Sequence, residues 1–324
     1  MEKQNVTILG CGRWGTFLGW YQNYIGNNSA IWGLEDSPHF QILKKEHKNE
    51  YVSLPNTIEL TSNLTYAISR ADIIIISISS QAFRSFLSTI DKSLLKGKKI
   101  VLCMKGIEEA TGKRLSEVAI ESGIDENNLA VWLGPGHIQE FVKEVPNCMI
   151  IDSHNHALTK ELVEKFNSKL IRFYYGNDII GNEIGAATKN VIGIAAGMLD
   201  GLGYTTLKGP LMARGVREVA RLMVALGGKA ETAYSLSHLG DYETTLFCEH
   251  SQNKTFGEKF IKKQPYEKLA EGVMTTKAVK EIADRLHIDM PITSALYSVL
   301  FENADPALQL EKLLTRSIKK EFES

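Results

Sequence analysis

The sequence has almost no net charge and few cysteines. Its 37 Lys and Arg residues nearly balance 38 Asp and Glu residues, which leaves a formal net charge of −1 over 324 residues. This balance gives no reason to expect a protein that binds nucleic acid or a membrane surface. The four cysteines include no CxxC pair, so we expect reduced thiols rather than a disulfide framework, and no metal site.

Long apolar runs are also missing. The most apolar segment, within residues 71–77, is far shorter than the roughly 18 residues that cross a bilayer, so no membrane insertion is expected. Residues 5–9 are too few to form the apolar region of a signal peptide, and they lead directly into glycines. These absences favour a soluble protein of the cytoplasm.

The first half of the chain alternates short apolar runs with amphipathic segments. A continuous β-branched run such as residues 71–77 is typical of a strand buried on both faces. Strands that alternate with helices predict a mostly parallel sheet with right-handed crossovers. The predicted strands cover residues 6–9, 30–32, 71–77, 99–103 and 129–133, and residues 148–151 and 170–174 are expected to extend the sheet.

The second half has a different pattern. Beyond residue 183 helical periodicity dominates and no buried strand is predicted. Helices are expected over residues 183–199, 210–226, 268–286 and 292–301. Because a chain of this length fits about two domains, we predict an α/β domain over residues 1–180 and an all-α domain over residues 181–324.

A glycine-rich turn follows the first predicted strand. Residues 10–15 have the spacing GxGxxG and open a predicted helix. Gly10 permits a tight turn, Gly12 lets backbone N–H groups approach a pyrophosphate, and Gly15 lets the helix pack close to the strand. A turn with no ligand is the alternative, but three correctly spaced glycines are destabilising without a use. We therefore expect residues 1–180 to be a Rossmann-like domain that binds NAD or NADP.

The choice between the two dinucleotides depends on the end of the second strand. An acidic residue there accepts a hydrogen bond from the free ribose hydroxyl of NAD, and Glu35 or the adjacent Asp36 can take this place. Arg13, inside the glycine turn, is the opposing signal because it can attract a phosphate. The sequence favours NAD, with Glu35 as the candidate, and leaves NADP open.

One predicted helix carries a single lysine on a stripe of glycines. Residues four apart share a helix face, and this face presents Gly181, Gly185, Lys189, Gly193, Gly197 and Gly201. Each glycine inside a helix costs roughly 1 kcal/mol relative to alanine, so something must approach this face closely. Tight helix packing, with Lys189 extending to solvent, is one explanation. Because its neighbours are small and apolar, we instead expect Lys189 to be buried and able to act as a general acid or base.

Further motifs follow the predicted strands and helices in a fixed order. They are GCGRWGT at 10–16, SQ at 80–81, KG at 105–106, GPGH at 134–137, GAATKNVIGIAAGMLDGLG at 185–203, LGD at 239–241, SQNK at 251–254, EG at 271–272 and MPI at 290–292. With this series the chain resembles the bacterial NAD(P)-dependent sn-glycerol-3-phosphate dehydrogenases over nearly its whole length. The motif around Lys189 is the most specific, whereas many dehydrogenases share the glycine turn.

The resemblance implies an activity and a set of site residues. The reaction would be hydride transfer between nicotinamide and C2 of dihydroxyacetone phosphate, giving sn-glycerol 3-phosphate for glycerophospholipids, in a homodimeric enzyme. Lys189 would be the catalytic lysine, and Asp241 would hold and tune it. The implied contacts to the small phosphorylated substrate are Lys105, Gly134, Gly136, Ser251, Gln252 and Asn253. The implied cofactor contacts, beyond the glycine turn and Glu35, are Arg13, Trp14, Lys105, Ile138, Gln252, Leu269 and Glu271.

The chain departs from the usual pattern of this family at a few positions. Gln252 stands where arginine is usual, so a multi-donor phosphate ligand is missing, and Lys254, Lys105 or Arg214 are candidates to replace it. The other departures are Arg13, Leu34, Gly136 and Ile138. A related reductase of another small phosphorylated or carboxylated ketone therefore stays an alternative. A non-catalytic dinucleotide-binding sensor is disfavoured, because Lys189 and Asp241 are both present.

Two histidine signals are interpreted conservatively. His154 and His156 lie in a polar segment with no further ligand cluster, which is typical of a solvated turn rather than a metal site. His238 lies three residues before Asp241 and either supports the site or simply packs in the core. Packing is the favoured interpretation of His238.

Overall fold

The computed structural model describes residues 3–318 and 320–321 and contains one continuous sheet. The strands are β1 (Asn5–Leu9), β2 (Asn28–Trp32), β3 (Glu59–Thr61), β4 (Ile73–Ile76), β5 (Lys99–Leu102), β6 (Leu129–Leu133), β7 (Asn147–Asp152) and β8 (Ile171–Tyr175). Their order is β3-β2-β1-β4-β5-β6-β7-β8, and every neighbouring pair is parallel except β6 and β7. The mostly parallel sheet and its two late strands are confirmed. The edge strand β3 was not predicted, because three residues are too few for a periodic signal.

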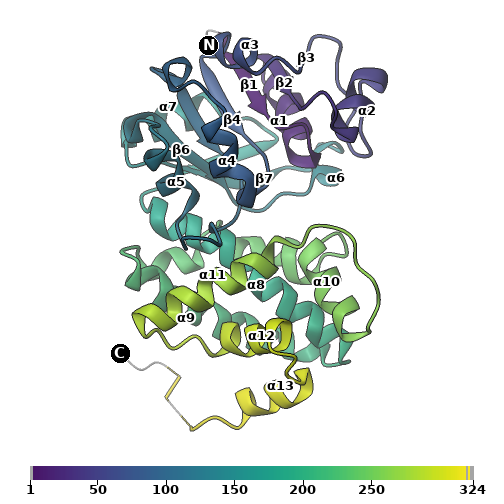
Figure 1. The fold of residues 1–324 in the computed structure, drawn as a ribbon, viewed down its shortest axis with the longest axis vertical. Coiled ribbons are helices and arrows are strands. Elements are labelled where there is room, and N and C mark those ends of the chain that lie inside the picture. The colour runs from purple at the N-terminus through teal and green to yellow at the C-terminus, as the bar shows by residue number, and fades with distance from the viewer. Residues whose placement is uncertain (1–2, 319, 322–324) are drawn as a thin grey trace.

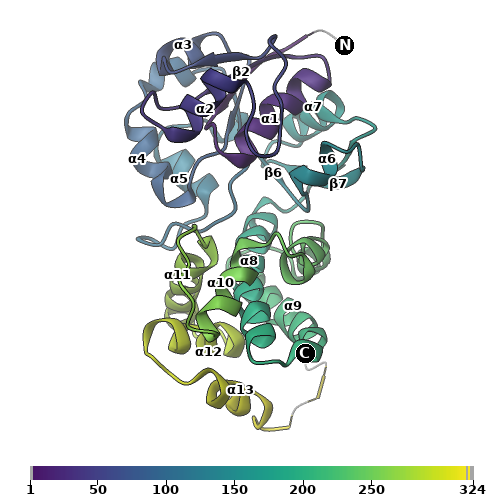
Figure 2. The same ribbon diagram turned by 90° about the vertical axis from the view of Figure 1, so that its right-hand side faces the viewer.

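Helices cover both faces of this sheet. They are α1 (Arg13–Tyr24), α2 (Pro38–Glu46), α3 (Leu64–Ser69), α4 (Phe83–Ser88), α5 (Leu115–Glu121), α6 (Ile138–Phe141) and α7 (His156–Phe166). Figure 2 shows α1 and α7 on one side of the domain and α4 and α5 on the other. Alternate residues of β4 pack into two hydrophobic cores, one on each face of the sheet. Ile73 and Ile75 belong to one core, and Ile74 belongs to the other. Burial on both faces explains the unbroken β-branched run in the sequence.

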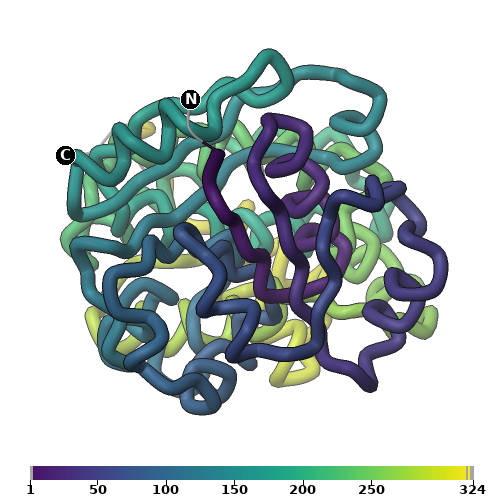
Figure 3. Tube along the Cα trace, turned by 90° about the horizontal axis from the view of Figure 1, so that it is seen from above, coloured from purple at the N-terminus to yellow at the C-terminus, as the bar shows by residue number. Residues whose placement is uncertain are grey.

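The helical domain follows directly after β8. It contains α8 (Ile179–Gly201), α9 (Lys208–Ala225), α10 (Gln252–Ile261), α11 (Glu271–Leu286), α12 (Pro291–Phe301) and α13 (Pro306–Leu314). Figure 1 shows these helices below the α/β domain, and Figure 3, from above, shows them behind it. The four helices predicted from periodicity are confirmed as α8, α9, α11 and α12, with ends that differ by up to four residues. None of the described helices is both long and apolar enough to cross a membrane.

The glycine stripe of α8 is explained by close packing. A side chain at Gly197 would overlap the carbonyl oxygen of Lys254 in α10. A Cβ at Gly193 would lie 2.8 Å from a methyl group of Thr245, and one at Gly185 would lie 2.9 Å from Cβ of His238. The packing explanation is therefore right for these glycines. Its corollary, a lysine that extends to solvent, is wrong, because Lys189 is buried.

Candidate active site

The glycine-rich turn joins β1 to the first turn of α1. Gly10 has φ +123°, and a side chain at Gly10 or Gly15 would overlap a backbone carbonyl oxygen. A Cβ at Gly12 would instead meet none of the described atoms within 4 Å. No side chain caps the N-terminus of α1, so its N–H groups are available to an anion. Two glycines are thus required by packing, and the open side of Gly12 fits the close approach of a pyrophosphate.

Residues next to the turn hold it against α6. The Arg13 guanidinium stacks 4.5 Å from the centre of the Tyr51 ring, and its Nη2 donates a hydrogen bond of 2.9 Å to Oε1 of Gln139. Trp14 lies against Phe141, with ring centres 6.5 Å apart. A Cβ at Gly136 would lie 2.7 Å from the Phe141 ring and 3.4 Å from Trp14, so this departure from the family pattern is explained by packing. Ile138 is buried at the start of α6.

Glu35 lies at the surface, three residues beyond the end of β2. Lys44 donates a hydrogen bond of 2.6 Å to Oε1 of Glu35, and Gln41 donates another at 3.2 Å. The hydrogen bond from Lys44 is the main reason that the pKa of Glu35 is lowered to about 2. The adjacent Leu34 side chain is exposed. The carboxylate is therefore ionised at neutral pH.

Lys189 is buried in the middle of α8 with its ammonium group against a carboxylate. Its Nζ lies 2.6 Å from Oδ2 of Asp241. Burial disfavours the charged amine and lowers the pKa of Lys189 to about 7, although attraction to Asp241 opposes the shift. Lys105 repels the same charge and lowers the pKa further. An amine with a pKa near neutrality can both donate and accept a proton under ordinary conditions.

Asp241 is shared by two lysines from different parts of the fold. Its Oδ2 lies 2.7 Å from Nζ of Lys105 as well as near Lys189, and the Thr244 hydroxyl donates to its Oδ1. Burial alone would raise the pKa of Asp241, but attraction to the two ammonium groups holds it below its usual range. The carboxylate therefore stays ionised and fixes the two cations in one place. Thr244 was not predicted from the sequence, although it lies only three residues after Asp241, the last residue of the LGD motif.

Lys105 reaches this cluster from the carboxyl end of β5. Besides Asp241, its Nζ donates a hydrogen bond of 2.7 Å to the carbonyl oxygen of Gly134, which follows β6. Gly134 has φ +118° and therefore adopts a left-handed conformation that favours glycine. Doubly wound sheets bind their ligands at this edge, where the chain leaves the carboxyl ends of the strands. The structure thus brings Lys105, Gly134, Lys189 and Asp241 together, from four separate motifs of the sequence.

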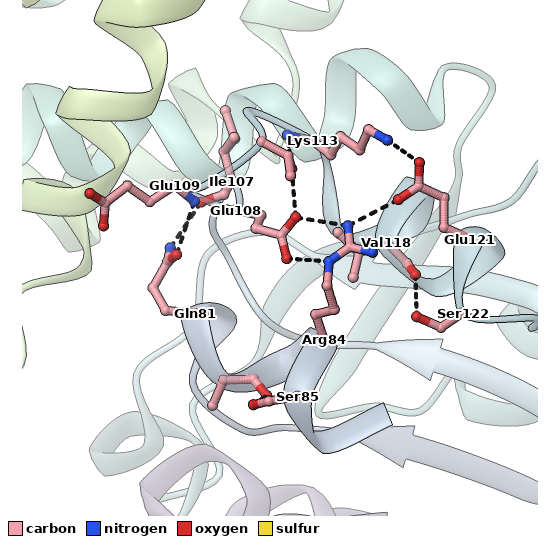
Figure 4. Close-up of polar contacts among 12 residues, drawn as sticks. Gln81, Arg84, Ser85, Ile107, Glu108, Glu109, Lys113, Val118, Glu121 and Ser122 are labelled. Atoms are coloured by element: carbon pink, nitrogen blue, oxygen red, sulfur yellow. Dashed lines mark hydrogen bonds and ion pairs between the residues drawn. The ribbon is translucent and has the colours of Figure 1, made fainter. Parts of the chain in front are cut away.

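The loop that carries Lys105 is held by hydrogen bonds to Gln81, which act on the backbone just after Lys105. Gln81 donates a hydrogen bond of 2.9 Å to the carbonyl oxygen of Ile107 and accepts one of 3.0 Å from the backbone N–H of Glu109 (Figure 4). Glu109 in turn pairs with Lys277 of α11 at 2.6 Å. The Ser-Gln motif after β4 therefore acts through the backbone of this loop, a role that the sequence did not indicate.

An ion cluster holds the same loop to the α/β domain. Figure 4 shows Arg84 between Glu108 and Glu121. Arg84 makes two hydrogen bonds of 2.8 Å to the Glu108 carboxylate, and its Nη2 lies 3.0 Å from Glu121. Lys113 also contacts Glu121. A bidentate pair of a guanidinium and a carboxylate restricts the orientation of both side chains more than a single hydrogen bond does. This cluster therefore holds the loop in place a few residues after Lys105.

The N-terminus of α10 presents the predicted phosphate residues. Ser251 caps the helix, and Oδ1 of Asn253 accepts a hydrogen bond of 2.9 Å from the backbone N–H of Gly272. The Tyr266 hydroxyl donates 2.8 Å to Oε1 of Gln252, so this amide is already held by the protein. Lys254 turns away to Asp200 at 3.4 Å, which makes it a poor replacement for the missing arginine.

Of the remaining predicted residues, Glu271 lies near Lys105 and Lys189, whereas Arg214 lies elsewhere. Glu271 begins α11, and burial raises its pKa to about 7, while Lys105 and Lys189 are close enough to oppose the shift. Leu269 is exposed in the loop before it. Arg214 lines a separate groove of about 1150 Å³ between α9, α12 and α13, so the structure does not place it with the other cations of the site.

Comparison with known proteins identifies the family of this chain. The N-terminal family model of NAD-dependent glycerol-3-phosphate dehydrogenase matches residues 5–159, and the C-terminal model matches residues 178–311. The chain is 38% identical to the glycerol-3-phosphate dehydrogenase [NAD(P)+] of Chlorobium phaeobacteroides and 35% identical to that of Prosthecochloris aestuarii, each over 98% of this chain and 99% of the relative. The crystal structure of glycerol-3-phosphate dehydrogenase from Coxiella burnetii has a TM-score of 0.89 and 29% identity, over 97% of this chain and 99% of that one. The chain belongs to the NAD-dependent glycerol-3-phosphate dehydrogenase family.

Proposed function

We propose that this protein interconverts dihydroxyacetone phosphate and sn-glycerol 3-phosphate with NAD or NADP as cofactor. The observation that carries the proposal is the cluster of buried Lys189 and Asp241 with half-buried Lys105, at the edge of the sheet where its parallel strands end. Full-length similarity to enzymes of this name supports the substrate. The product would supply glycerophospholipid synthesis.

The chemistry of the site follows from the lysine. When bound, a nicotinamide cofactor supplies a hydride to C2 of the ketone or takes it up in the reverse direction. Lys189, as an ammonium, donates a proton to the oxygen on C2 and stabilises the negative charge that develops there. In oxidation, neutral Nζ of Lys189 accepts the hydroxyl proton. Asp241 keeps this nitrogen in place, and its ionised carboxylate favours the charged form.

The α/β domain supplies the residues that would hold the cofactor. The open side of Gly12 and the uncapped N-terminus of α1 fit a pyrophosphate, with Arg13 close by. Glu35 would accept a hydrogen bond from a ribose hydroxyl. Leu269 and Glu271 approach from the helical domain, and Lys105 is proposed to contact both cofactor and substrate.

A direct assay tests this proposal. We expect the purified protein to oxidise NADH in the presence of dihydroxyacetone phosphate and to release sn-glycerol 3-phosphate. We also expect kcat/KM to be higher with NADH than with NADPH, because the Glu35 carboxylate repels a 2′-phosphate. The assay includes other small phosphorylated and carboxylated ketones. Turnover of one of these, with none of dihydroxyacetone phosphate, would contradict the proposed substrate.

Gln252 gives a second test of substrate recognition. We expect Gln252→Arg to lower the KM for dihydroxyacetone phosphate, because a guanidinium at the start of α10 adds a charge-assisted contact to phosphate. The change also removes the Gln252 amide from Tyr266. Steady-state kinetics of the wild type and of Gln252→Arg measures the effect. Tyr266→Phe is the control for the lost hydrogen bond. An unchanged or raised KM would mean that another group already fills this role.

The proposal includes a homodimer in the cytoplasm. Support comes from apolar side chains that are exposed on the helical domain, among them Val224, Leu308 and Leu314. Exposed apolar surface of this kind is often covered by a second subunit. Light scattering on the purified protein measures the mass in solution, and a value of one chain at micromolar concentration would contradict the dimer.

A further inference from the structure

Asp241 lies in a segment that is hydrogen-bonded to α8 at two successive turns. The Ser237 hydroxyl donates 2.8 Å to Oδ1 of Asn182. One turn further along α8, Nδ1 of His238 lies 2.9 Å from the carbonyl oxygen of Gly185. Gly185 lies four residues before Lys189 and therefore on the same helix face. The segment that carries the carboxylate is thus fastened to the helix that carries the lysine.

The hydrogen bonds of His238 determine its tautomer. A carbonyl oxygen can only accept, so Nδ1 carries the proton that bonds to Gly185. In the neutral ring Nε2 is then an acceptor, and the Tyr242 hydroxyl, 2.7 Å away, donates to it. Both side chains are fully buried. Burial lowers the pKa of His238 to about 4, so the ring is neutral at physiological pH and both of its nitrogens have partners.

We propose that His238 is a positioning residue that sets the distance between the carboxylate of Asp241 and the amine of Lys189. The imidazole links Gly185 on α8 to Tyr242, which directly follows Asp241 in the chain. His238 itself lies three residues before Asp241, so the backbone is held on both sides of the carboxylate. This inference rests on the proposed role of Lys189 as the proton donor and acceptor.

The glycine at position 185 allows the segment with His238 to lie close to α8. A Cβ there would lie 2.9 Å from Cβ of His238 and 3.2 Å from Oγ of Ser237. These distances are closer than ordinary carbon contacts, so the segment can approach the helix backbone only because residue 185 has no side chain. The favoured interpretation of His238 from the sequence, a histidine that only packs, is replaced by one in which its packing has a catalytic consequence.

A displaced Asp241 should change the titration of Lys189. Attraction to Asp241 raises the pKa of Lys189, so a longer distance lowers this pKa. The other titratable groups around the amine are Lys105, His137, His238 and Glu271. Neutral His238 adds no charge of its own, so its replacement acts on Lys189 through geometry.

The experiment compares His238→Ala, His238→Asn and Tyr242→Phe with the wild type over a range of pH. We expect His238→Ala to lower kcat for ketone reduction by about 10- to 100-fold, because misplacement by an ångström has effects of this size. Its kcat profile should move to lower pH by up to about one unit. The KM for NADH should stay unchanged. Asparagine retains a donor for the Gly185 carbonyl, so His238→Asn should recover much of the loss, and Tyr242→Phe should lie between the two.

Tyr21→Phe is the matched control. Tyr21 is a fully buried tyrosine of the α/β domain whose hydroxyl bonds to Phe166 and Ser168, so its loss should lower Tm without moving the pH profile. An unchanged pH profile in His238→Ala, or equal losses of kcat in the alanine and asparagine variants, would overturn the proposal. If His238→Ala fails to fold, His238→Asn and Tyr242→Phe still test the predicted order of kcat values and pH profiles.

A measurement that does not depend on turnover separates this inference from the proposed function. The amine of Lys189 is titrated by NMR in protein labelled with ¹³C at the lysine side chains, with Lys189→Ala used to assign the signal. A lower midpoint in His238→Ala and in Tyr242→Phe is expected whether or not dihydroxyacetone phosphate is the substrate. An unchanged midpoint would refute the positioning role, whereas failure of the ketone assay alone would refute only the substrate.

Discussion

Lys189→Ala is expected to abolish turnover while leaving cofactor binding intact. The substitution removes the proton donor and the positive charge that stabilises the developing alkoxide, which together should lower kcat by at least about 1,000-fold. The fold should survive, because Asp241 keeps Lys105 and Thr244 as partners. Steady-state kinetics measures turnover, and the fluorescence of bound NADH measures cofactor binding.

Two further variants make this result specific. Lys189→Arg retains a permanent positive charge that cannot be lost near neutral pH, so glycerol 3-phosphate oxidation, which needs a neutral base, should remain poor. Lys99→Ala is the control. Lys99 is the first residue of β5, at the opposite end of the strand from Lys105, and it pairs with Glu161 of α7. Turnover by Lys189→Ala above about a tenth of the wild type would exclude the lysine as the essential acid and base.

Asp241→Asn is expected to lower kcat by roughly 100-fold and to move the pH dependence of both directions to lower pH. In the wild type, reduction needs charged Lys189, so its rate falls as pH rises through about 7, while the oxidation rate rises over the same range. Asp241 raises the pKa of Lys189, so its replacement lowers this midpoint. At pH 7 a smaller fraction of Lys189 is then charged, and reduction is slower. Profiles of kcat against pH in both directions measure the shift.

Asp200→Asn is the matched control for this variant. Asp200 also pairs with two lysines, Lys208 at 2.6 Å and Lys254 at 3.4 Å, but it lies near the C-terminal end of α8, three turns from Lys189. Its loss should lower stability without moving the pH profile. If the profile of Asp241→Asn coincides with that of the wild type, Asp241 does not tune the lysine, and its role is limited to holding the fold.

The predictable parts of the fold are those with a strong local pattern. Ile73–Ile76 and the periodic helix around Lys189 are buried on nearly all sides, so their sequences show it directly. Strand β3 and helix α13 were not predicted, because β3 has three residues and no described residue of α13 is buried. Helix α10 was also missed, because only Gly257 of its ten residues is buried and the sequence shows little apolar face.

The sequence predicted which residues belong to the candidate site better than it predicted the contacts between them. Lys189 and Asp241 were identified from the glycine stripe and from the family motif. The contact of Asp241 with Lys105 joins residues 136 positions apart in the chain, and no local pattern encodes that distance. The partners of Gln252 and of Lys254 are also tertiary contacts, and they change which groups are available to a phosphate.

The sequence by itself determined the two-domain architecture, the dinucleotide turn and the family, because these depend on short-range spacing of glycines, apolar residues and motifs. Tertiary structure decided which glycines of α8 serve packing, how Asp241 is shared between two lysines, and what His238 does. These outcomes depend on which side chains meet across elements, and burial at that meeting point sets the charge of Lys189.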